Sequence, residues 1–515
     1  MRYGFAIDQR TCIGCHACTV ACKTEHQVPI GQFRTWVKYI DKGEWPDSTR
    51  AFGVMRCNHC TDAPCVAICP TKALFKRDDG IVDFDSERCI GCKSCMQACP
   101  YDAIYIDEDT HTAAKCNYCA HRVDDGLEPA CVVVCPTHSI WAGDLDDPAS
   151  GIAQLVASNA TTVRAPEQNT GPNVFYIGAD RAVLNPMLAP VDGSYIWSQP
   201  DPHRKAVSED LMAIAAATGA RTTLNTAHPR PWGWRVTTYL WTKGVGAGAL
   251  LVAAGALLGG EQPEGVLALA APAIGVGATA LTGGLLVWDL KRPERFWYIF
   301  AKANPRSWLF LGSACLAGYS AVSGSWLAAA LGESVGLVSS STTKRAVSVL
   351  RWLAVPSAAA AAGYTAFLFG QAEGRDLWQS RLLLPHLLVQ ALQGGSGVLL
   401  TLSALTAGQT RVTKMLAGTF VASSAANLAT IATEYGRSHK TPQAAAAAEM
   451  ITKGRYRKLF WAGAVGLGGL AAGLATPAVK GRRLRRAALA GVLGQVALLA
   501  YESVFVRAGQ DVPLS

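Results

Sequence analysis

The chain has 515 residues, a formal net charge of +9 and 50% hydrophobic residues, with a mean hydropathy of +0.18. All of its 17 cysteines except Cys315 lie between Cys12 and Cys135, whereas long apolar runs fill the sequence from about residue 236 onward. This length exceeds that of a typical domain, and the uneven distribution excludes a single uniform globular fold. We therefore expect two domains of different kinds in series.

Four groups of four cysteines occupy the first part of the chain. They are Cys12, Cys15, Cys18 and Cys22; Cys57, Cys60, Cys65 and Cys69; Cys89, Cys92, Cys95 and Cys99; and Cys116, Cys119, Cys131 and Cys135. The first and third groups follow the spacing C-x2-C-x2-C-x3-C, in which three cysteines hold one [4Fe–4S] cluster and the fourth holds a neighbouring cluster. These cysteines therefore predict four [4Fe–4S] clusters.

Two other roles for many cysteines fit the sequence less well. A disulfide framework is typical of secreted chains, but the opening MRYGFAIDQR contains neither the apolar segment of a signal peptide nor a twin-arginine signal. Structural zinc sites use two close pairs of ligands, whereas the first and third groups have three cysteines at steps of three followed by a fourth. Iron–sulfur clusters remain the favoured interpretation.

The segment between the second and third cysteine groups predicts a β-hairpin. Two short β-prone stretches flank Asp79-Gly80, a dipeptide typical of tight turns. The segments CIGCHACTVAC and CIGCKSCMQAC are two copies of one pattern. We therefore predict an α+β, duplicated ferredoxin-like iron–sulfur domain over residues 1–184. Residues 185–230, rich in Pro, Gly, Ser and Asn, are expected to form a linker.

Residues 231–515 predict an all-α membrane domain of eight transmembrane helices. About twenty apolar residues span the hydrocarbon core of a bilayer. Eight such runs are present, at about 236–259, 264–288, 307–331, 346–370, 378–404, 412–434, 459–478 and 486–506. Their Gly, Ala and Ser content favours close helix packing in lipid. An even number of spans returns both ends of this domain to one side, called here the cluster side, where the iron–sulfur domain must lie.

Ionisable and aromatic residues gather near the cluster side of these spans. The candidate residues for binding a quinone and moving its protons are Tyr239, Lys243, Asp289, Arg292, Glu373, His386 and Glu434. Charged groups at membrane depth are costly and usually functional, although several of these residues could instead be anchors at the level of the lipid headgroups. A haem relay needs pairs of axial histidines, and His386 is the single histidine well inside a predicted span, so we expect no haem.

Residues 1 to about 180 resemble the four-cluster iron–sulfur subunit of membrane-bound molybdopterin oxidoreductases of the polysulfide and dimethyl sulfoxide reductase type. The resemblance rests on CNHCTDAPCVAICPTKAL, CIGCKSCMQACPYDAI and CNYCAHRVDDGLEPACVVVCPTHSI. It implies that the groups cross-ligate. The implied ligand sets are Cys12, Cys15, Cys18 and Cys135; Cys22, Cys116, Cys119 and Cys131; Cys57, Cys60, Cys65 and Cys99; and Cys69, Cys89, Cys92 and Cys95.

Residues from about 231 resemble the haem-free, eight-span NrfD/PsrC family of quinone-interacting membrane subunits. The segment LLVWDLKRPERFW is similar to the Asp-Leu-x-Arg-Pro-x-Arg-Phe loop that follows the second span in that family. The resemblance implies a quinone head near the cluster side, among the first turns of the first span, where this sequence has Tyr239 and Lys243. The two parts are usually separate chains, and here they are fused.

Together these features predict an electron-transfer and membrane-anchor subunit of a quinone-linked oxidoreductase. We expect it to pass electrons through four [4Fe–4S] clusters between a pool of menaquinone or ubiquinone and a separate catalytic subunit. The resemblance implies that this partner carries molybdopterin, and no nucleic-acid partner is expected. Two alternatives remain open: a redox-driven proton-translocating module of an assembly like alternative complex III, and a membrane anchor without quinone chemistry.

We expect a multi-pass protein of the prokaryotic inner (cytoplasmic) membrane. Lys and Arg are more numerous in the loops and flanking turns of the cluster side than in those of the opposite side, and positive charge marks the cytoplasmic side. The iron–sulfur domain is therefore expected on the cytoplasmic face. The alternative is the periplasmic face, which the basic run KGRRLRR at residues 480–486 favours.

Overall fold

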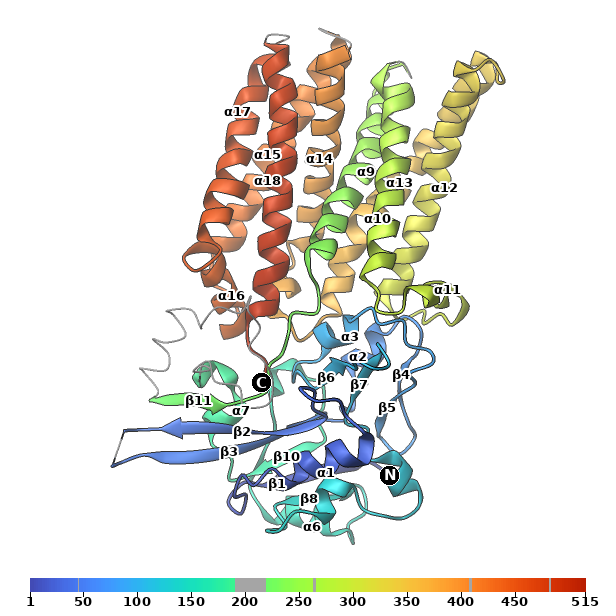
Figure 1. Ribbon diagram of the computed structural model, residues 1–515. Helices are drawn as coiled ribbons and strands as arrows, with labels where there is room; N and C mark the ends of the chain where they lie inside the picture. The colour runs from blue at the N-terminus through green and yellow to red at the C-terminus, as the bar shows by residue number, and fades with distance from the viewer. Residues whose placement is uncertain (45, 190–218, 263–264, 407–409, 481–482) are drawn as a thin grey trace.

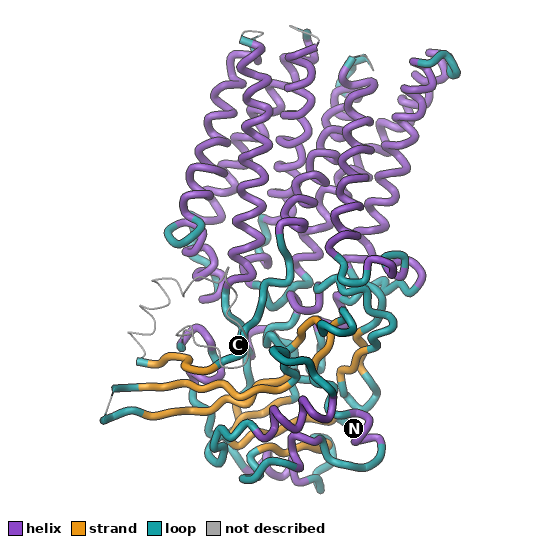
Figure 2. Tube along the Cα trace, viewed as in Figure 1, coloured by secondary structure: helices purple, strands orange, loops and turns teal. Residues whose placement is uncertain are grey.

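A cysteine-rich domain lies against one end of a helical bundle in the computed structural model (Figure 1). The structure describes all residues except 45, 190–218, 263–264, 407–409 and 481–482. The described strands all lie in the cysteine-rich domain, and the bundle above it is helical (Figure 2). This arrangement confirms the predicted fold class, an α+β ferredoxin-like domain followed by an all-α domain with eight long apolar helices.

A four-stranded sheet joins the two ends of the iron–sulfur sequence. Strand β1 (Tyr3–Asp8) pairs in antiparallel fashion with β8 (Ile140–Asp144) and in parallel fashion with β10 (Val174–Ile177), which carries the short β9 (Thr161–Thr162) at the edge. The apolar residues of β1 are fully buried. Because β1 lies just before the first cysteine group and β8 just after the last, this sheet brings those two groups together.

Two small hairpins repeat the same unit inside the domain. Strands β4 (Leu74–Lys76) and β5 (Val82–Phe84) form one, and β6 (Ile104–Ile106) and β7 (Ala113–Lys115) form the other. The first turns at the predicted Asp79-Gly80 position, where Gly80 has a φ of +86° that favours glycine. Short helices lie within or beside the cysteine groups: α1 (Ala17–His26), α2 (Pro64–Ile68), α3 (Ser94–Ala98), α4 (Ala120–Asp124) and α5 (Ala130–Val133).

The expected linker contains regular structure where it is described. Strand β11 (Ala220–Leu224) pairs with β2 (Thr35–Lys42), which pairs along its full length with β3 (Thr49–Arg56). The sequence ARTTL alternates exposed and buried side chains, as a strand at the edge of a sheet does. Residues 220–224 therefore belong to the iron–sulfur domain, which corrects the expectation of a simple connection. The rest of the expected linker, residues 190–218, lies outside the described residues.

Eight helices of the described chain are long and apolar enough to cross a membrane. They are α9 (Trp234–Leu258), α10 (Ala271–Asp289) with the preceding π-helical turn η3 (Val266–Ala270), α12 (Trp308–Ser334), α13 (Ser340–Gly370), α14 (Leu383–Thr406), α15 (Arg411–Tyr435), α17 (Leu467–Val479) with the preceding η6 (Leu459–Gly466), and α18 (Leu484–Asp511). These bounds follow the eight predicted spans closely. Shorter helices connect them on the cluster side: η4 (Pro293–Arg295), α11 (Tyr298–Ala301), η5 (Asp376–Gln379) and α16 (Pro442–Thr452).

Glycines let the central helices of the bundle approach closely. A Cβ added at Gly248 of α9 would lie 1.7 Å from the carbonyl oxygen of Ala391 on α14, and one added at Gly395 would lie 2.0 Å from the backbone of Gly248. No larger residue fits at either position, because the two backbones are in contact there. In lipid, such contacts between small residues supply much of the helix association. Helix α9 is accordingly the most buried of the eight candidate spans.

Candidate functional site

Each group of three cysteines meets a fourth cysteine from a distant segment. The side chains of each set are close enough to interact electrostatically. We name the sets by their order from the bundle outward: tetrad 1 is Cys69, Cys89, Cys92 and Cys95; tetrad 2 is Cys57, Cys60, Cys65 and Cys99; tetrad 3 is Cys22, Cys116, Cys119 and Cys131; tetrad 4 is Cys12, Cys15, Cys18 and Cys135. Tetrads 1 and 4 each line a cavity.

The four tetrads follow one another through the domain. Cys95 of tetrad 1 is near Cys65 of tetrad 2. Cys57 of tetrad 2 is near Cys116 of tetrad 3. Tetrads 3 and 4 meet where Cys131 is near Cys18. These contacts between successive tetrads give a continuous row of thiols that begins at the bundle.

The surroundings of the thiols suit metal-bound sulfur. Burial raises the pKa of Cys60 and Cys92 to about 12, so that as free thiols they would be protonated at neutral pH, whereas a bound metal deprotonates a thiol outright. Backbone N–H groups already face the sulfurs, as from Gly91 to Cys89 Sγ at 3.4 Å and from Ser139 to Cys135 Sγ at 3.2 Å. Such donors stabilise sulfur ligands of iron. Among the described residues, no three His, Cys, Asp or Glu side chains are placed to hold a single metal ion.

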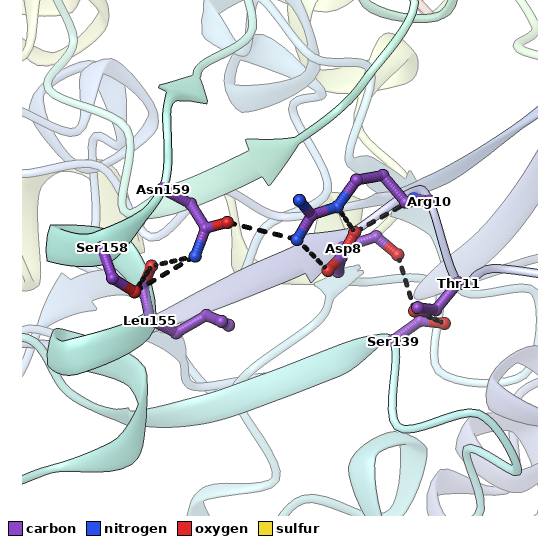
Figure 3. A network of polar contacts seen from close by, with 7 residues as sticks. All are labelled: Asp8, Arg10, Thr11, Ser139, Leu155, Ser158 and Asn159. Atoms are coloured by element: carbon purple, nitrogen blue, oxygen red, sulfur yellow. Dashed lines mark hydrogen bonds and ion pairs between the residues drawn. The ribbon is translucent and has the colours of Figure 1, made fainter.

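A polar network fixes the outer end of the row (Figure 3). Arg10 forms a fork with the carboxylate of Asp8, with distances of 2.8 and 2.7 Å, and also donates to Asn159. The Arg10 guanidinium holds the pKa of Asp8 below its usual range. The hydroxyl of Thr11 lies 2.9 Å from that of Ser139. These contacts tie the turn before Cys12 to the segment after Cys135, so both parts of tetrad 4 are held in one place.

The inner end of the row is held by the last residue of α10 and the loop that follows it. Asp289 forms an ion pair of 2.7 Å with Lys93, which lies between Cys92 and Cys95, and both side chains are almost completely buried. The backbone N–H of Arg292 donates to the carbonyl oxygen of Ile90, and its guanidinium donates to that of Thr110. The predicted residues Asp289 and Arg292 therefore contact the loop that carries tetrad 1.

A second set of contacts joins the last residues of α18 to the same domain. Gln510 accepts a hydrogen bond from Gln97, which lies just before Cys99, and another from the backbone of Trp232. Arg375 donates to Gln97 and to the carbonyl oxygens of Gln510 and Val512. The indole of Trp232 donates to the carbonyl oxygen of Cys92. The segments that carry tetrads 1 and 2 are thus in direct contact with the end of α18 and with the residues just before α9 and η5.

A buried polar network lies inside the bundle near the cluster side. His386 Nε2 lies 2.8 Å from Asn427 Oδ1, and His386 Nδ1 lies 3.4 Å from Glu434 Oε2. The hydroxyl of Tyr501 lies 3.4 Å from both His386 and Glu434, and Asn427 donates to Gln393. All five side chains are buried. Three helices, α14, α15 and α18, contribute to this network.

An apolar cavity with three polar groups lies beside this network. It is lined by Leu240, Trp241, Lys243, Gly244, Val245, Ala362, Leu387, Gln390, Leu498 and Glu502. The ammonium of Lys243 donates to the carbonyl oxygen of Ala362 at 2.9 Å and to the hydroxyl of Thr365. Glu502 is close enough to interact electrostatically with Lys243 on one side and with His386 on the other. It therefore connects the cavity to the buried network.

The seven predicted quinone and proton residues occupy several different places. His386 and Glu434 contact one another, and Lys243 lines the cavity. Tyr239 is buried near both Glu502 and Asp289. Asp289 and Arg292 lie at the contact with tetrad 1, as described above. Glu373 lies outside the spans, near Asp62. Its pKa is raised mainly by burial and, to a smaller extent, by the negative charge of Asp62.

Several residues of the buried network and of the cavity beside it were not predicted as site residues. They are Gln390, Gln393, Asn427, Tyr501 and Glu502. A signal was present for two of them, because Gln390 and Gln393 follow His386 at steps of four and seven, which places all three on one face of a helix. Their meeting with α15 and α18 depends on how the helices pack, which the sequence pattern does not specify.

Two known families match different parts of the chain. Residues 222–513 match the family described as Polysulphide reductase, NrfD. The chain belongs to the NrfD family. Residues 49–145 match the family described as 4Fe-4S dicluster domain. The NrfD match covers all eight long helices and confirms a multi-pass membrane protein.

The iron–sulfur part of this NrfD-family chain is similar to separate subunits of reductases. A subunit of the tetrathionate reductase of Salmonella typhimurium is 44% identical over 191 residues, which are 36% of this chain and 76% of the relative. A subunit of the polysulfide reductase of Wolinella succinogenes is 41% identical over 179 residues, 34% of this chain and 94% of the relative. Protein NrfC of Escherichia coli K12 is 41% identical over 180 residues, 34% and 81% of the two proteins.

These relatives confirm the predicted fusion. The chain is an iron–sulfur electron-transfer subunit joined to an NrfD membrane domain, and it is a redox subunit of the kind found in reductase complexes. Its iron–sulfur character is confirmed by the dicluster match and by the names of its relatives.

Replacing Asp289 with Asn is expected to loosen the loop that carries tetrad 1. The substitution leaves Lys93 buried without its counter-charge, and removing one partner of a buried ion pair typically costs about 3–5 kcal/mol. We expect amide hydrogen exchange at residues 89–95 to rise at least about tenfold, with no change in β2 and β3. The matched control is Glu294→Gln, which removes the exposed partner of Arg292 and should change nothing. Equal exchange in D289N and the native chain would contradict this role of the ion pair.

Proposed function

We propose that this chain passes electrons between a membrane quinone pool and a separate catalytic subunit through four [4Fe–4S] clusters. The observation that carries the proposal is the continuous row of four cysteine tetrads that starts where Lys93 meets Asp289 of the bundle. Electron transfer needs redox centres in succession, and a row that ends at a membrane domain connects lipid-soluble and water-soluble partners.

The proposed ligands of the clusters are the sixteen cysteines of tetrads 1 to 4. Three features support four-iron clusters at these places: the spacing of the groups, the meeting of each triplet with a fourth cysteine, and the N–H donors aimed at Cys89 and Cys135. When bound, the clusters supply one-electron chemistry. The protein supplies the ligands, the hydrogen bonds to sulfur and the low-dielectric surroundings.

The proposed quinone site is the cavity lined by Lys243, Gln390 and Glu502. Ligand cavities are typically apolar with a few convergent polar groups, and this one has two donors and a carboxylate among Leu, Val and Ala side chains. Quinone reduction takes up two protons with two electrons. Glu502, His386 and Glu434 form a succession of ionisable groups leading away from the cavity, which is the arrangement that proton exchange with a buried ligand requires.

The proposed catalytic partner binds at the outer end of the row and carries molybdopterin. Cys15 of tetrad 4 is exposed, and the exposed apolar side chains of Ile13, Val20 and Val133 lie on the elements that carry tetrads 3 and 4. Exposed apolar side chains around a functional centre are typical of protein contact surfaces. The relatives named as subunits of tetrathionate and polysulfide reductases support a partner of this class.

We place the protein in the prokaryotic inner membrane with the iron–sulfur domain on the cytoplasmic side. The excess of Lys and Arg in the cluster-side loops supports this orientation. The contacts that Arg292, Asn304 and Arg375 make with the iron–sulfur domain all come from loops on that side.

Quinone-coupled turnover should depend on the His386 and Glu434 pair. We expect Glu434→Gln and His386→Ala to lower it by about a hundredfold, because a positioned proton-transfer group contributes about 10²–10⁴ in rate. Iron content and electron transfer from artificial dyes should stay unchanged. Glu449→Gln on α16 is the control, since that carboxylate pairs with Lys453 at the surface. Unchanged quinone kinetics in both variants would assign the pair a structural role.

Purification from native membranes in mild detergent should recover a large molybdopterin-containing subunit with this chain. Mass spectrometry identifies the partner, and iron analysis should give the iron of four [4Fe–4S] clusters per chain. Recovery of multihaem cytochromes and further membrane subunits would instead favour the proton-translocating assembly. Iron for fewer than four clusters would contradict the ligand sets.

The orientation can be measured by labelling in intact cells. A cysteine introduced at Lys480, in the basic run between α17 and α18, should react with a membrane-impermeant maleimide added from outside. A cysteine introduced at Arg437, on the cluster side, should react only after the cells are opened. The reverse pattern would place the iron–sulfur domain in the periplasm.

A further inference from the structure

Arg56 lies between tetrads 3 and 4, at the end of strand β3. Its side chain is fully buried, and Nη1 donates to Cys131 Sγ at 3.2 Å. Its charge also acts on Cys116 of tetrad 3 and on Cys18 of tetrad 4. Although Cys57 follows directly in the sequence, the guanidinium therefore faces two tetrads other than the one to which Cys57 belongs.

The guanidinium of Arg56 has no carboxylate partner among the residues that the structure describes. Its Nε and Nη2 atoms are buried without a hydrogen-bond acceptor of the protein, and the ring of Phe5 covers one face at 4.3 Å. An isolated buried charge is strongly unfavourable. The nearby negative charge that would compensate it comes from thiolates and sulfides, which fits iron–sulfur clusters bound at tetrads 3 and 4.

Two other buried cations near the tetrads, Lys93 and Lys115, have different surroundings. Lys93, beside tetrad 1, is neutralised by Asp289. Lys115 is near Cys65 of tetrad 2, and its ammonium donates to the carbonyl oxygens of Val82 and Cys116. Arg56 is set apart by its direct hydrogen bond to a cysteine sulfur and by the two nitrogen atoms that find no acceptor in the protein.

We propose that Arg56 raises the reduction potentials of the two clusters held by tetrads 3 and 4. The inference rests on the proposed function, because it requires clusters at both tetrads. Each cluster gains one negative charge when it accepts an electron, and a fixed positive charge nearby stabilises that reduced state. Net charge and hydrogen bonds to sulfur are among the main determinants of such potentials. Arginine keeps its charge at every accessible pH, so the stabilisation is constant.

The consequence is a difference between the inner and outer halves of the row. An electron is held more strongly at tetrads 3 and 4 than it would be without Arg56. At tetrad 1, next to the membrane, the charge of Lys93 is neutralised by Asp289 and gives no comparable stabilisation. Arg56 is thus a positioning residue that acts through the cysteine ligands and sets the energy of the step toward the outer end.

The test is a redox titration of the purified full-length protein, followed by electron paramagnetic resonance. In Arg56→Gln we expect two of four midpoints to fall, so that the ratio of reduced to oxidised cluster at a fixed potential drops at least tenfold, which corresponds to about 59 mV for one electron. Arg56→Lys keeps the charge and should stay within about threefold of the native ratio. Arg77→Gln is the matched control, because Arg77 is paired with Asp79 and Asp124, and it should shift no midpoint.

Four unchanged midpoints in R56Q, with full iron content, would overturn the inference. An equal shift of all four would also overturn it, because that result indicates general loosening of the domain. If R56Q loses iron, the R56K variant decides: native midpoints with full iron support the inference, and loss of iron there as well assigns Arg56 a purely structural role. Fewer than four clusters in the native protein would instead contradict the proposed function, independently of Arg56.

Discussion

The organisation of the iron–sulfur domain depends on one constraint, namely that each triplet of cysteines meets a fourth cysteine from a distant segment. Cys12 and Cys135 meet across more than a hundred residues, and the sheet formed by β1 and β8 brings them together. Cys22 likewise meets Cys131. Because every triplet is completed from elsewhere, no segment of the domain can shift without separating a tetrad. Because the cysteine sets tie these segments together, the short hairpins and helices between the groups need little stability of their own.

The junction between the two parts is buried and polar, unlike a flexible attachment. The Lys93–Asp289 ion pair and the hydrogen bonds among Gln97, Arg375 and Gln510 join the tetrad loops to α10, η5 and α18. Such contacts are geometrically demanding, since a buried polar group without its partner costs free energy. They hold tetrad 1 at a constant place relative to the bundle, as the proposed electron transfer between the two parts requires. The relatives of the iron–sulfur part are named as subunits of reductases, whereas here that part and the membrane domain form one chain.

Inside the bundle, close helix packing and buried polar groups are connected. The Gly248 and Gly395 contact brings α9 against α14, and these helices carry Lys243 and His386. Charged groups in a membrane are tolerated when they face one another inside the bundle. His386, Glu434 and Tyr501 satisfy this condition from three helices, and the neighbouring cavity contains Lys243 and a further carboxylate. The small residues that permit the packing therefore also permit the polar network.

The sequence by itself determined the elements and the chemistry that depend on local spacing. The four cysteine groups, the hairpin at Asp79-Gly80 and the eight apolar spans were all predictable. Cluster binding requires a fixed spacing of cysteines, a tight turn requires particular residues, and bilayer thickness requires a minimum length of apolar sequence. Only the tertiary structure decided which residues meet. Strand β11 was missed because its partner β2 lies far away in the sequence. Asp289 was a candidate quinone or proton residue from its position in the sequence, and its contact with Lys93 came only from the tertiary structure. Arg56 likewise gained significance only from its place between two tetrads. Long-range contacts such as these arise from tertiary packing, which a local sequence pattern does not specify.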